Sequence, residues 1–259
     1  MNVDVIVTAD LDMPEAYVFR PSGPRPLGLA QMLRPGAPKL DAHCLAFVIH
    51  HPDKGPILVD TGFHQDARTD RRKDFGLAMS LMFKSLKPAE EPFDEQLRQL
   101  GIEPSEIELT VMTHLHVDHT SGMRLLPNTK FVIAKAEWKA ATRKNADRAG
   151  FIAHHLPPED RVIEASALDL PGIRLIPTPG HTPGHMAVLI EEDDLLIAGD
   201  AAYTTKSIAE QRLPLLTSDD DAYAGSLGKL KDYANVIPAH DPDAWRRLRD
   251  PQTRVAQKA

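Results

Sequence analysis

The segment His114-Leu115-His116-Val117-Asp118-His119 places four potential metal ligands within six residues, directly after an apolar, strand-like run. Alternate side chains of an extended segment project to the same side, so His114 and His116 can bind one ion while Asp118 turns toward a second. His119 begins a predicted helix and can reach that second ion. A lone His-x-His is typical of a surface loop, whereas this density of imidazole and carboxylate indicates a divalent metal.

Three later residues extend the ligand set, and each lies at the carboxyl end of an apolar, strand-like run: His181, Asp200 and His240. Strands of one sheet system bring their ends to one edge, so we expect these side chains to converge with the motif. An unpaired carboxylate at the end of a buried strand would be too costly, so Asp200 needs partners. Its carboxylate can bridge two cations, and two metals roughly 3.5–4 Å apart can share a hydroxide whose pKa falls to about 7. The sequence therefore predicts a dinuclear site with a nucleophile available at neutral pH.

The composition is ordinary for a globular protein, with 42% hydrophobic and 26% charged residues among 259. This length fits one large domain or two small ones. A single cysteine, Cys44, excludes an internal disulfide and favours a reducing compartment. No signal-peptide pattern and no run long enough to span a bilayer is present, so we expect a cytoplasmic protein without a membrane partner. The formal net charge of -7 disfavours nucleic acid as the main partner.

Apolar, β-branched runs alternate with helical patterns along the chain, punctuated by Pro and Gly. The predicted strands are 44–50, 56–60, 107–112, 131–134, 173–176, 186–190, 195–198 and 235–238. The predicted helices are 93–100, 120–126, 136–148 and 218–233. Two similar strand-then-helix halves predict one α/β domain over residues 1–259, with sheets inside and helices outside.

Two segments resist a simple prediction. Residues 10–40 are rich in Pro and Gly, and no element is assigned to them. Residues 74–86 are apolar on more than one face, which is typical of a helix packed on a core. Their Met and Phe side chains would also suit a pliable pocket for an acyl chain, lined by Met79, Met82, Phe83 and Leu86. An exposed apolar face on the same segment could instead serve a homodimer.

Several polar residues near these motifs have two interpretations. Asp60 could accept the free ring proton of a ligating histidine and fix its tautomer, or it could simply begin a turn. His185 is predicted to be a hydrogen-bonded structural residue. The remaining histidines are taken as ordinary surface or core residues: His43, His50, His51, His64, His154 and His155.

The ordered set of ligands resembles the metallo-β-lactamase superfamily, and the resemblance covers residues 45 to 241. It implies an αββα sandwich of two β-sheets flanked by helices. The phrase Asp200-Ala201-Ala202-Tyr203 is similar to the Asp-x-x-Tyr signature of the quorum-quenching N-acyl homoserine lactone lactonases. The phrases at 57–62, 178–185 and 239–241 are also similar to that family.

The resemblance implies a role for each residue of the set. His114, His116 and His181 would hold one metal, Asp118, His119 and His240 the other, and Asp200 would bridge. The bridging hydroxide would attack the lactone carbonyl while one metal and Tyr203 stabilise the oxyanion. Asp118 would pass a proton to the leaving ring oxygen. Zinc is the default for these ligands, although iron, manganese or cobalt would fit.

Other reactions of the same fold remain alternatives. Thioester hydrolysis of the glyoxalase II type uses the same ligands, but those enzymes carry a helical C-terminal extension, whereas only residues 242–259 follow His240. Another esterase or lactonase of the metallo-β-lactamase fold is a further alternative. A nuclease of this fold would need a basic exosite or an inserted domain, and neither is evident. True β-lactamases of the fold usually have Cys at the position of Asp200, and flavodiiron proteins usually have Glu at the position of His116, so this sequence matches neither. A purely structural metal is disfavoured because such sites are commonly four-coordinate and cysteine-rich.

Overall fold

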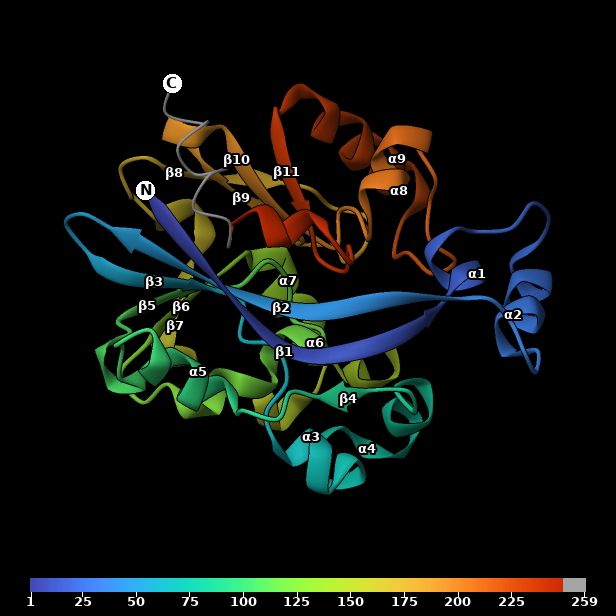
Figure 1. Cartoon of the computed structure of the whole chain (residues 1–259), viewed down its shortest axis with the longest axis horizontal. Helices are drawn as coiled ribbons and strands as arrows, with labels where there is room; N and C mark the ends of the chain where they lie inside the picture. Colours follow the sequence, from blue (N-terminus) through green and yellow to red (C-terminus); the bar gives the residue numbers. More distant parts are fainter. Residues whose placement is uncertain (249–259) are drawn as a thin grey trace.

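Two β-sheets form the centre of the molecule. The computed structural model describes residues 1–248, apart from the side chain of Ala78. Within them a seven-stranded sheet has the order β4-β1-β2-β3-β5-β6-β7, and a four-stranded sheet has the order β11-β10-β9-β8 (Figure 1). The strands are β1 (Asn2–Pro14), β2 (Lys39–His51), β3 (Gly55–Val59), β4 (Lys87–Pro88), β5 (Leu109–Val111), β6 (Lys130–Ile133), β7 (Val162–Glu164), β8 (Ile173–Pro177), β9 (Met186–Ile190), β10 (Leu195–Gly199) and β11 (Asn235–Pro238).

Helices lie around the two sheets, and two of them lie where β1 and β2 extend beyond the sandwich (Figure 1). The helices are α1 (Glu15–Val18), α2 (Arg25–Leu33), α3 (Asp66–Thr69), α4 (Arg71–Met82), α5 (Phe93–Gln99), α6 (Val117–Thr120), α7 (Lys135–Ala141), α8 (Thr205–Glu210) and α9 (Asp220–Lys229). Among residues 1–248, no helix combines the length and the apolar character needed to cross a bilayer. The predicted domain of residues 1–259 extends past the described part, so residues 249–259 lie outside it.

Successive side chains of a strand pack into different layers of the sandwich. In β2, Leu45, Phe47 and Ile49 belong to the core between the sheets, whereas Ala46 and Val48 face the layer of α5 and α7. The second sheet sends Val188 and Ile197 into the same central core. Side chains of successive strand residues point to opposite faces, so one strand serves two cores. The predicted αββα sandwich is confirmed.

The connections set the direction of the strands that carry the predicted ligands. β3, β5, β6 and β7 are parallel, and each pair is joined by a crossover that contains helical turns. In the second sheet β10 is parallel to β11, while β9 is antiparallel to both β8 and β10. Hence β8, β10 and β11 run the same way and deliver their carboxyl ends to one edge.

The structure supplies the elements of residues 10–40, to which the sequence assigned none. β1 and β2 pair antiparallel from Asn2 with His50 to Pro14 with Lys39, and α1 and α2 lie between them. A bulge between Val7 and Ala9 shifts the register by one residue, so the odd-numbered residues of β1 pack into the core between the sheets before the bulge and into a different apolar cluster after it. Leu11 and Met13 still alternate with Asp10 and Asp12, a strand signal that the surrounding Pro and Gly obscured.

Helix ends also differ from the predictions. The helix predicted at 136–148 is shorter: α7 ends at Ala141, and a separate 3-10 turn, Ala146–Ala149, follows Asn145, which adopts a left-handed conformation with φ 59°. The helix predicted at 218–233 is α9, which begins after Asp219, whose side chain accepts from the Ala222 amide. Residues 74–86 do not form one straight helix: α4 is kinked where Gly76 has φ 77°, and it ends at Met82.

Candidate metal centre

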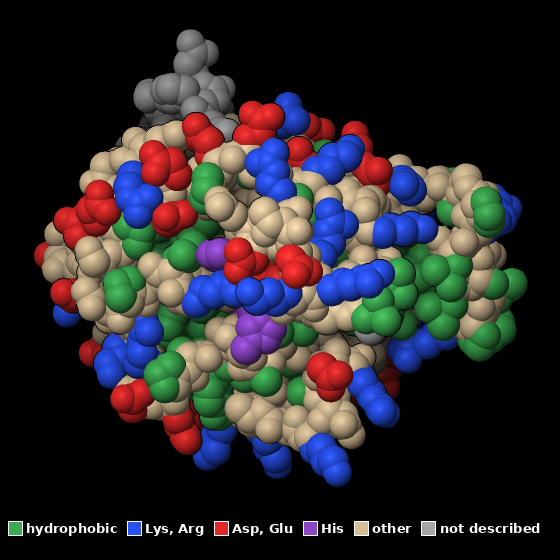
Figure 2. Space-filling model, turned by 90° about the horizontal axis from the view of Figure 1, so that it is seen from below, with side chains coloured by type: hydrophobic (Ala, Val, Ile, Leu, Met, Phe, Trp, Pro, Cys, Tyr) green, Lys and Arg blue, Asp and Glu red, His purple; other side chains and the backbone are tan. Residues whose placement is uncertain are grey.

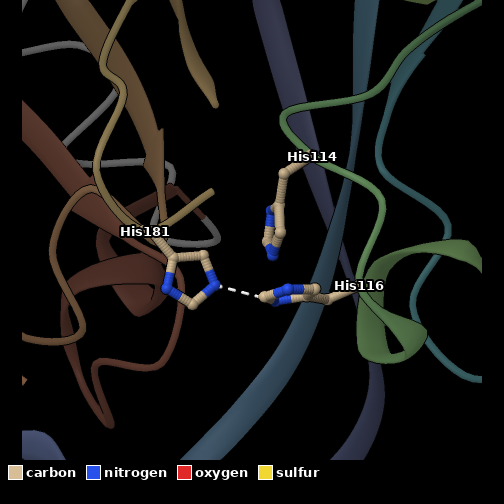
Figure 3. A group of neighbouring side chains, drawn as sticks. All are labelled: His114, His116 and His181. Atoms are coloured by element: carbon tan, nitrogen blue, oxygen red, sulfur yellow. Dashed lines mark hydrogen bonds between the residues drawn. The ribbon is translucent and has the colours of Figure 1, made fainter. Parts of the chain in front are cut away.

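Three imidazoles form a first group at the edge where the sheets end. His114 follows β5, with His116 two residues later, and His181 follows β8 in a Pro-Gly turn. Their ligand atoms lie within 4.8 Å of one another, and His181 Nε2 and His116 Nδ1 are 2.9 Å apart (Figure 3). Figure 3 shows the three rings pointing into one space from two different loops. This group has the nitrogen donors that a divalent ion takes.

A second group lies beside the first and is organised around Asp200, which follows β10 directly. Asp200 Oδ1 is 3.4 Å from His119 Nε2 and 3.3 Å from His240 Nε2. Asp118 Oδ2 approaches the same two nitrogens at 3.9 and 3.6 Å. The other carboxylate oxygen, Oδ2, faces the first group, at 3.2 Å from His181 Nε2 and 4.0 Å from His114 Nε2. One oxygen of Asp200 therefore faces each group.

Several atoms at the centre of this arrangement are buried without hydrogen-bond partners among residues 1–248. They are His114 Nε2, His119 Nε2, His240 Nε2 and Asp200 Oδ1. An unsatisfied buried polar atom costs about 1–3 kcal/mol, so four of them in one place require a further partner. Imidazole nitrogen and carboxylate oxygen are donors for zinc and similar cations. The residues fit a metal centre.

The electrostatics of the site agree with ligation. Burial lowers the pKa values of His114 and His181 well below the usual one, despite the opposing charge of Asp200, so both rings are neutral. Burial also opposes the charged form of His119 and His240, but the carboxylates of Asp60 and Asp200 respectively raise their pKa values well above the usual one. Because ligation requires a neutral imidazole, a divalent cation would displace these two protons.

Asp60 holds one of these imidazoles in place. It follows β3 and has a left-handed backbone with φ 58°. Its carboxylate accepts hydrogen bonds from the Thr113 amide at 2.8 Å, the Thr113 hydroxyl at 2.7 Å and His119 Nδ1 at 2.7 Å. With Nδ1 donating, the tautomer of His119 leaves Nε2 aimed at Asp200. Of the two interpretations of Asp60, the geometry favours the acceptor of a ring proton.

His185 positions Asp200 from the opposite side. Its Nε2 accepts from the Asp200 amide at 2.9 Å, and its Nδ1 lies 2.8 Å from the Thr178 hydroxyl. Burial lowers the pKa of His185 to about 3, so the ring stays neutral and can accept. These contacts agree with the prediction of a hydrogen-bonded structural histidine.

The sequence is similar to proteins of a known family. The family model of the metallo-beta-lactamase superfamily matches residues 41–240. The chain belongs to this superfamily. N-acyl homoserine lactonase AiiA of Bacillus thuringiensis subsp. kurstaki is 30% identical over 183 residues, which cover 70% of this chain and 72% of that protein. N-acyl homoserine lactonase AttM of Azorhizobium caulinodans is 30% identical over 221 residues, which cover 77% and 82%.

Solved structures of the superfamily agree. An N-acyl homoserine lactone hydrolase, with the product N-hexanoyl-L-homoserine bound at its catalytic metal center, superposes with a TM-score of 0.71 at 25% identity and covers 95% of this chain and 96% of its own. AidC, described as a dizinc quorum-quenching lactonase, has the same fold at a TM-score of 0.64 and 17% identity, over 93% and 87% of the two chains. The resemblance found in the sequence motifs is confirmed.

Tyr203 lies over the candidate metal centre. Its ring is 2% exposed and stacks on His240, with centroids 5.3 Å apart and planes at 21°. Its hydroxyl lies 3.5 Å from His181 Nδ1 and 3.4 Å from the Tyr17 hydroxyl. Burial and the neighbouring phenol of Tyr17 raise the pKa of Tyr203 well above its usual value, so the group is a hydrogen-bond donor at neutral pH.

An apolar wall adjoins the centre through Tyr203. It comprises Ala9, Leu11, Met13, Val18, Phe19, Ala42, Cys44, Phe63, Ala67, Phe75, Met79, Leu86, Val117, Ile152 and Tyr203, with Tyr17, Leu40 and Phe83 packed against it. Three of the four predicted pocket residues belong to this wall or pack on it, namely Met79, Phe83 and Leu86. Met82 does not: it is the last residue of α4 and is 48% exposed.

Apolar side chains are also exposed on the outside of the molecule. On α4, Leu77 and Leu81 are 56% and 66% exposed, and on α2, Leu27 and Leu33 are 49% and 72% exposed. Hydrophobic side chains gather at the right-hand end in Figure 2, where α2 lies in Figure 1. The predicted homodimer is not tested by these observations and stays a prediction.

Two buried carboxylates near the centre were not identified in the sequence. Glu137 of α7 accepts from the Leu115 amide at 2.9 Å and the Gly184 amide at 3.0 Å, so it joins the two loops that carry His114 and His181. Burial raises the pKa of Glu137, although these hydrogen bonds oppose the shift. No sequence pattern marks it, because an acid near the start of a helix is usually exposed.

Asp74 is the second buried carboxylate, and it joins the apolar wall to the motif loop. It accepts from Ser121 Oγ at 2.8 Å and Arg124 Nη2 at 2.6 Å, and His155 Nε2 lies at 3.2 Å. His155, taken as ordinary, is thus a buried member of this network, together with Thr120, whose hydroxyl is 3.1 Å from its Nδ1. The guanidinium of Arg124 already balances Asp74, which disfavours a cation here.

Proposed function

We propose that this protein hydrolyses the lactone ring of N-acyl homoserine lactones and so acts in quorum quenching. The observation that carries the proposal is that each oxygen of Asp200 faces a separate group of histidines, as a carboxylate shared by two cations would. The relatives named N-acyl homoserine lactonase support the choice of substrate. The lone Cys44 supports a cytoplasmic location.

We assign His114, His116 and His181 to one metal and Asp118, His119 and His240 to the other, with Asp200 between them. The neutral, buried imidazoles of the first group suit zinc, and iron, manganese or cobalt would take the same donors. When bound, two such ions lower the pKa of a water between them and polarise a carbonyl oxygen.

Tyr203 and Asp118 have separate roles in the hydrolysis. Water adds to the lactone carbonyl carbon, the bond from that carbon to the ring oxygen breaks, and the product is the ring-opened N-acyl homoserine. The Tyr203 hydroxyl donates to the carbonyl oxygen as it becomes negative. The Asp118 carboxylate, which is 7% exposed, accepts the proton of the attacking water and returns it to the leaving ring oxygen.

The substrate assignment is tested with a pH-indicator assay on acyl homoserine lactones of several chain lengths, simple lactones, thioesters and a phosphodiester. We expect acyl homoserine lactones to turn over fastest. Faster thioester hydrolysis would replace this proposal with a hydrolase of the glyoxalase II type.

The role of Tyr203 is tested with Tyr203→Phe. Loss of one oxyanion donor typically lowers turnover about 10²–10³-fold, and a looser contact lowers it less. We expect kcat to fall while both metals are retained in elemental analysis. Tyr233→Phe, at a partly buried position on the far helix layer, is the matched control and should keep full turnover. Unchanged kcat in Tyr203→Phe would remove the assigned role.

A further inference from the structure

A second phenol lies beside Tyr203 and comes from the segment that the sequence left unassigned. Tyr17 lies in α1, and its ring meets that of Tyr203 edge to face, with centroids 5.7 Å apart and planes at 85°. The Tyr203 hydroxyl donates to the Tyr17 hydroxyl at 3.4 Å. Tyr17 is no part of the predicted ligand set, so its contact with the proposed oxyanion donor needs a separate explanation.

The position of Tyr17 is fixed by contacts on its own segment. Its carbonyl accepts from the Leu215 amide at 2.8 Å, and the Arg20 amide donates to the Leu213 carbonyl at 2.9 Å. The Arg20 guanidinium binds both carboxylate oxygens of Asp220 at 2.7 and 2.6 Å. A planar guanidinium paired with a carboxylate in this way sets orientation as well as distance. The single turn of α1 is thereby tied to the start of α9, with Tyr17 aimed at the centre.

The two hydroxyls share one hydrogen-bond contact, so the role of one as donor or acceptor decides the role of the other. Burial raises the pKa of Tyr17 to about 12, and the nearby carboxylates of Asp200 and Asp118 add to the effect. Each hydroxyl has one proton to donate and two lone pairs that accept. The Tyr203 proton therefore cannot serve Tyr17 and a substrate oxygen at the same time. When Tyr203 turns its proton to a substrate, its oxygen is free to accept from Tyr17.

We propose that Tyr17 is a positioning residue whose hydroxyl donates to the Tyr203 oxygen while Tyr203 donates to the substrate oxygen. This inference rests on the proposed role of Tyr203. Hydrogen bonds in a chain polarise one another, so a donor behind Tyr203 strengthens its own donation. Tyr17 also holds the Tyr203 hydroxyl near the centre before the substrate arrives.

The kinetic test is a double-mutant cycle with Tyr17→Phe, Tyr203→Phe and the double variant, because Phe keeps the edge-to-face ring. One neutral hydrogen bond corresponds to about a five-fold change. We expect Tyr17→Phe to lower kcat by about that factor with little change in KM, and to have no further effect in the Tyr203→Phe background. Equal losses in both backgrounds, a rise in KM alone, or full kcat in Tyr17→Phe would each overturn the proposal.

A second measurement is independent of turnover. The chain has four tyrosines, so zinc-loaded protein labelled with 3-fluorotyrosine gives few ¹⁹F resonances, which Tyr→Phe variants assign. Tyr17→Phe should displace the Tyr203 resonance, whereas the control Tyr233→Phe should leave it in place. If the Tyr203 resonance has the same chemical shift in Tyr17→Phe as in wild type, the proposed contact between the two phenols is wrong, even if the enzyme is active. If wild-type protein opens no lactone, the proposed function fails, and this resonance still decides whether the pair exists.

Discussion

The metal centre and the apolar wall share Tyr203 but are held together by different forces. At the centre, hydrogen bonds hold the ligands and their loops: Asp60 binds His119, His185 binds Asp200, and Glu137 binds the loops around His114 and His181. The wall is formed by apolar side chains from segments that lie far apart in the chain, and apart from the hydroxyl contact of Tyr17 with Tyr203 these side chains meet by packing. A small change at the centre should therefore abolish metal binding or turnover. A change in the wall should instead alter the unfolding free energy or the acyl-chain preference, in proportion to the apolar area that is lost.

The largest expected effect is that of Asp200→Asn. The amide keeps one oxygen and loses the negative charge, so it cannot serve both groups of histidines. Metal content per chain should fall. Lactone turnover should fall by more than about 10–100-fold, which is the usual loss when a residue that hydrogen-bonds to a metal ligand is replaced. Elemental analysis after dialysis measures the first and the indicator assay the second. Asp53→Asn, in an exposed turn, is the control. Two metals still bound in Asp200→Asn would contradict the sharing of Asp200.

This part of the molecule could be predicted from the sequence because its ligands follow strands. His181, Asp200 and His240 each come after an apolar run, and strand direction alone brings them to one edge. Glu137 could not be predicted in the same way, since its role depends on how α7 meets two loops. That meeting is a tertiary contact, and Gly184 marks it only in the structure, where a Cβ would approach the Glu137 amide nitrogen to 2.2 Å.

The next effect in size is that of Asp60→Asn. Asparagine tolerates the left-handed backbone at this position, so the turn should persist. The variant replaces one acceptor oxygen with a donor, and His119 loses the group that fixes its tautomer. We expect metal affinity to fall about 10–100-fold. Competition with a chelator of known affinity measures the change. An unaltered affinity would show that the carboxylate only begins a turn.

The apolar wall was harder to predict because its pattern is interrupted. A bulge turns the odd-numbered residues of β1 to the other face of the sheet, Gly76 breaks α4 into two helical pieces, and α1 lies between Pro-rich turns. Periodicity therefore fails in the segments that surround the proposed pocket. The sequence indicated Met79, Phe83 and Leu86 by their chemistry, but chemistry alone could not distinguish them from Met82, which is exposed.

Asp74 connects the two regions, and its removal should have an intermediate effect. Burial alone would raise the pKa of this carboxyl, but the hydrogen bond and charge of His155, together with Ser121 and Arg124, lower it below its usual value. A lowered folded-state pKa stabilises the fold above the unfolded value of about 3.9, and this stabilisation is lost as pH falls through the folded value. Asp74→Asn should therefore cost about 1–3 kcal/mol at neutral pH.

Urea unfolding of Asp74→Asn and wild type across pH tests the sign. The difference in unfolding free energy should be constant above about pH 5 and should shrink as the wild-type carboxyl becomes protonated below about pH 4. A difference that grows toward acid pH would mean that Asp74 is not held as a carboxylate. Asp53→Asn again provides a matched control without a buried partner.

The smallest expected effect separates the two methionines of α4. Met82 is 48% exposed and Met79 is 8% exposed, although three residues separate them. Met82→Ser should change the unfolding free energy by no more than about 0.5 kcal/mol, as surface substitutions usually do. Met79→Ala removes buried contacts with the wall and should cost about 2 kcal/mol or more. The same pair should differ in catalysis: Met79→Ala alone should alter the relative kcat/KM for short and long acyl chains. If Met82→Ser shifted that ratio as strongly, the outward face of α4 would have to be part of the substrate site.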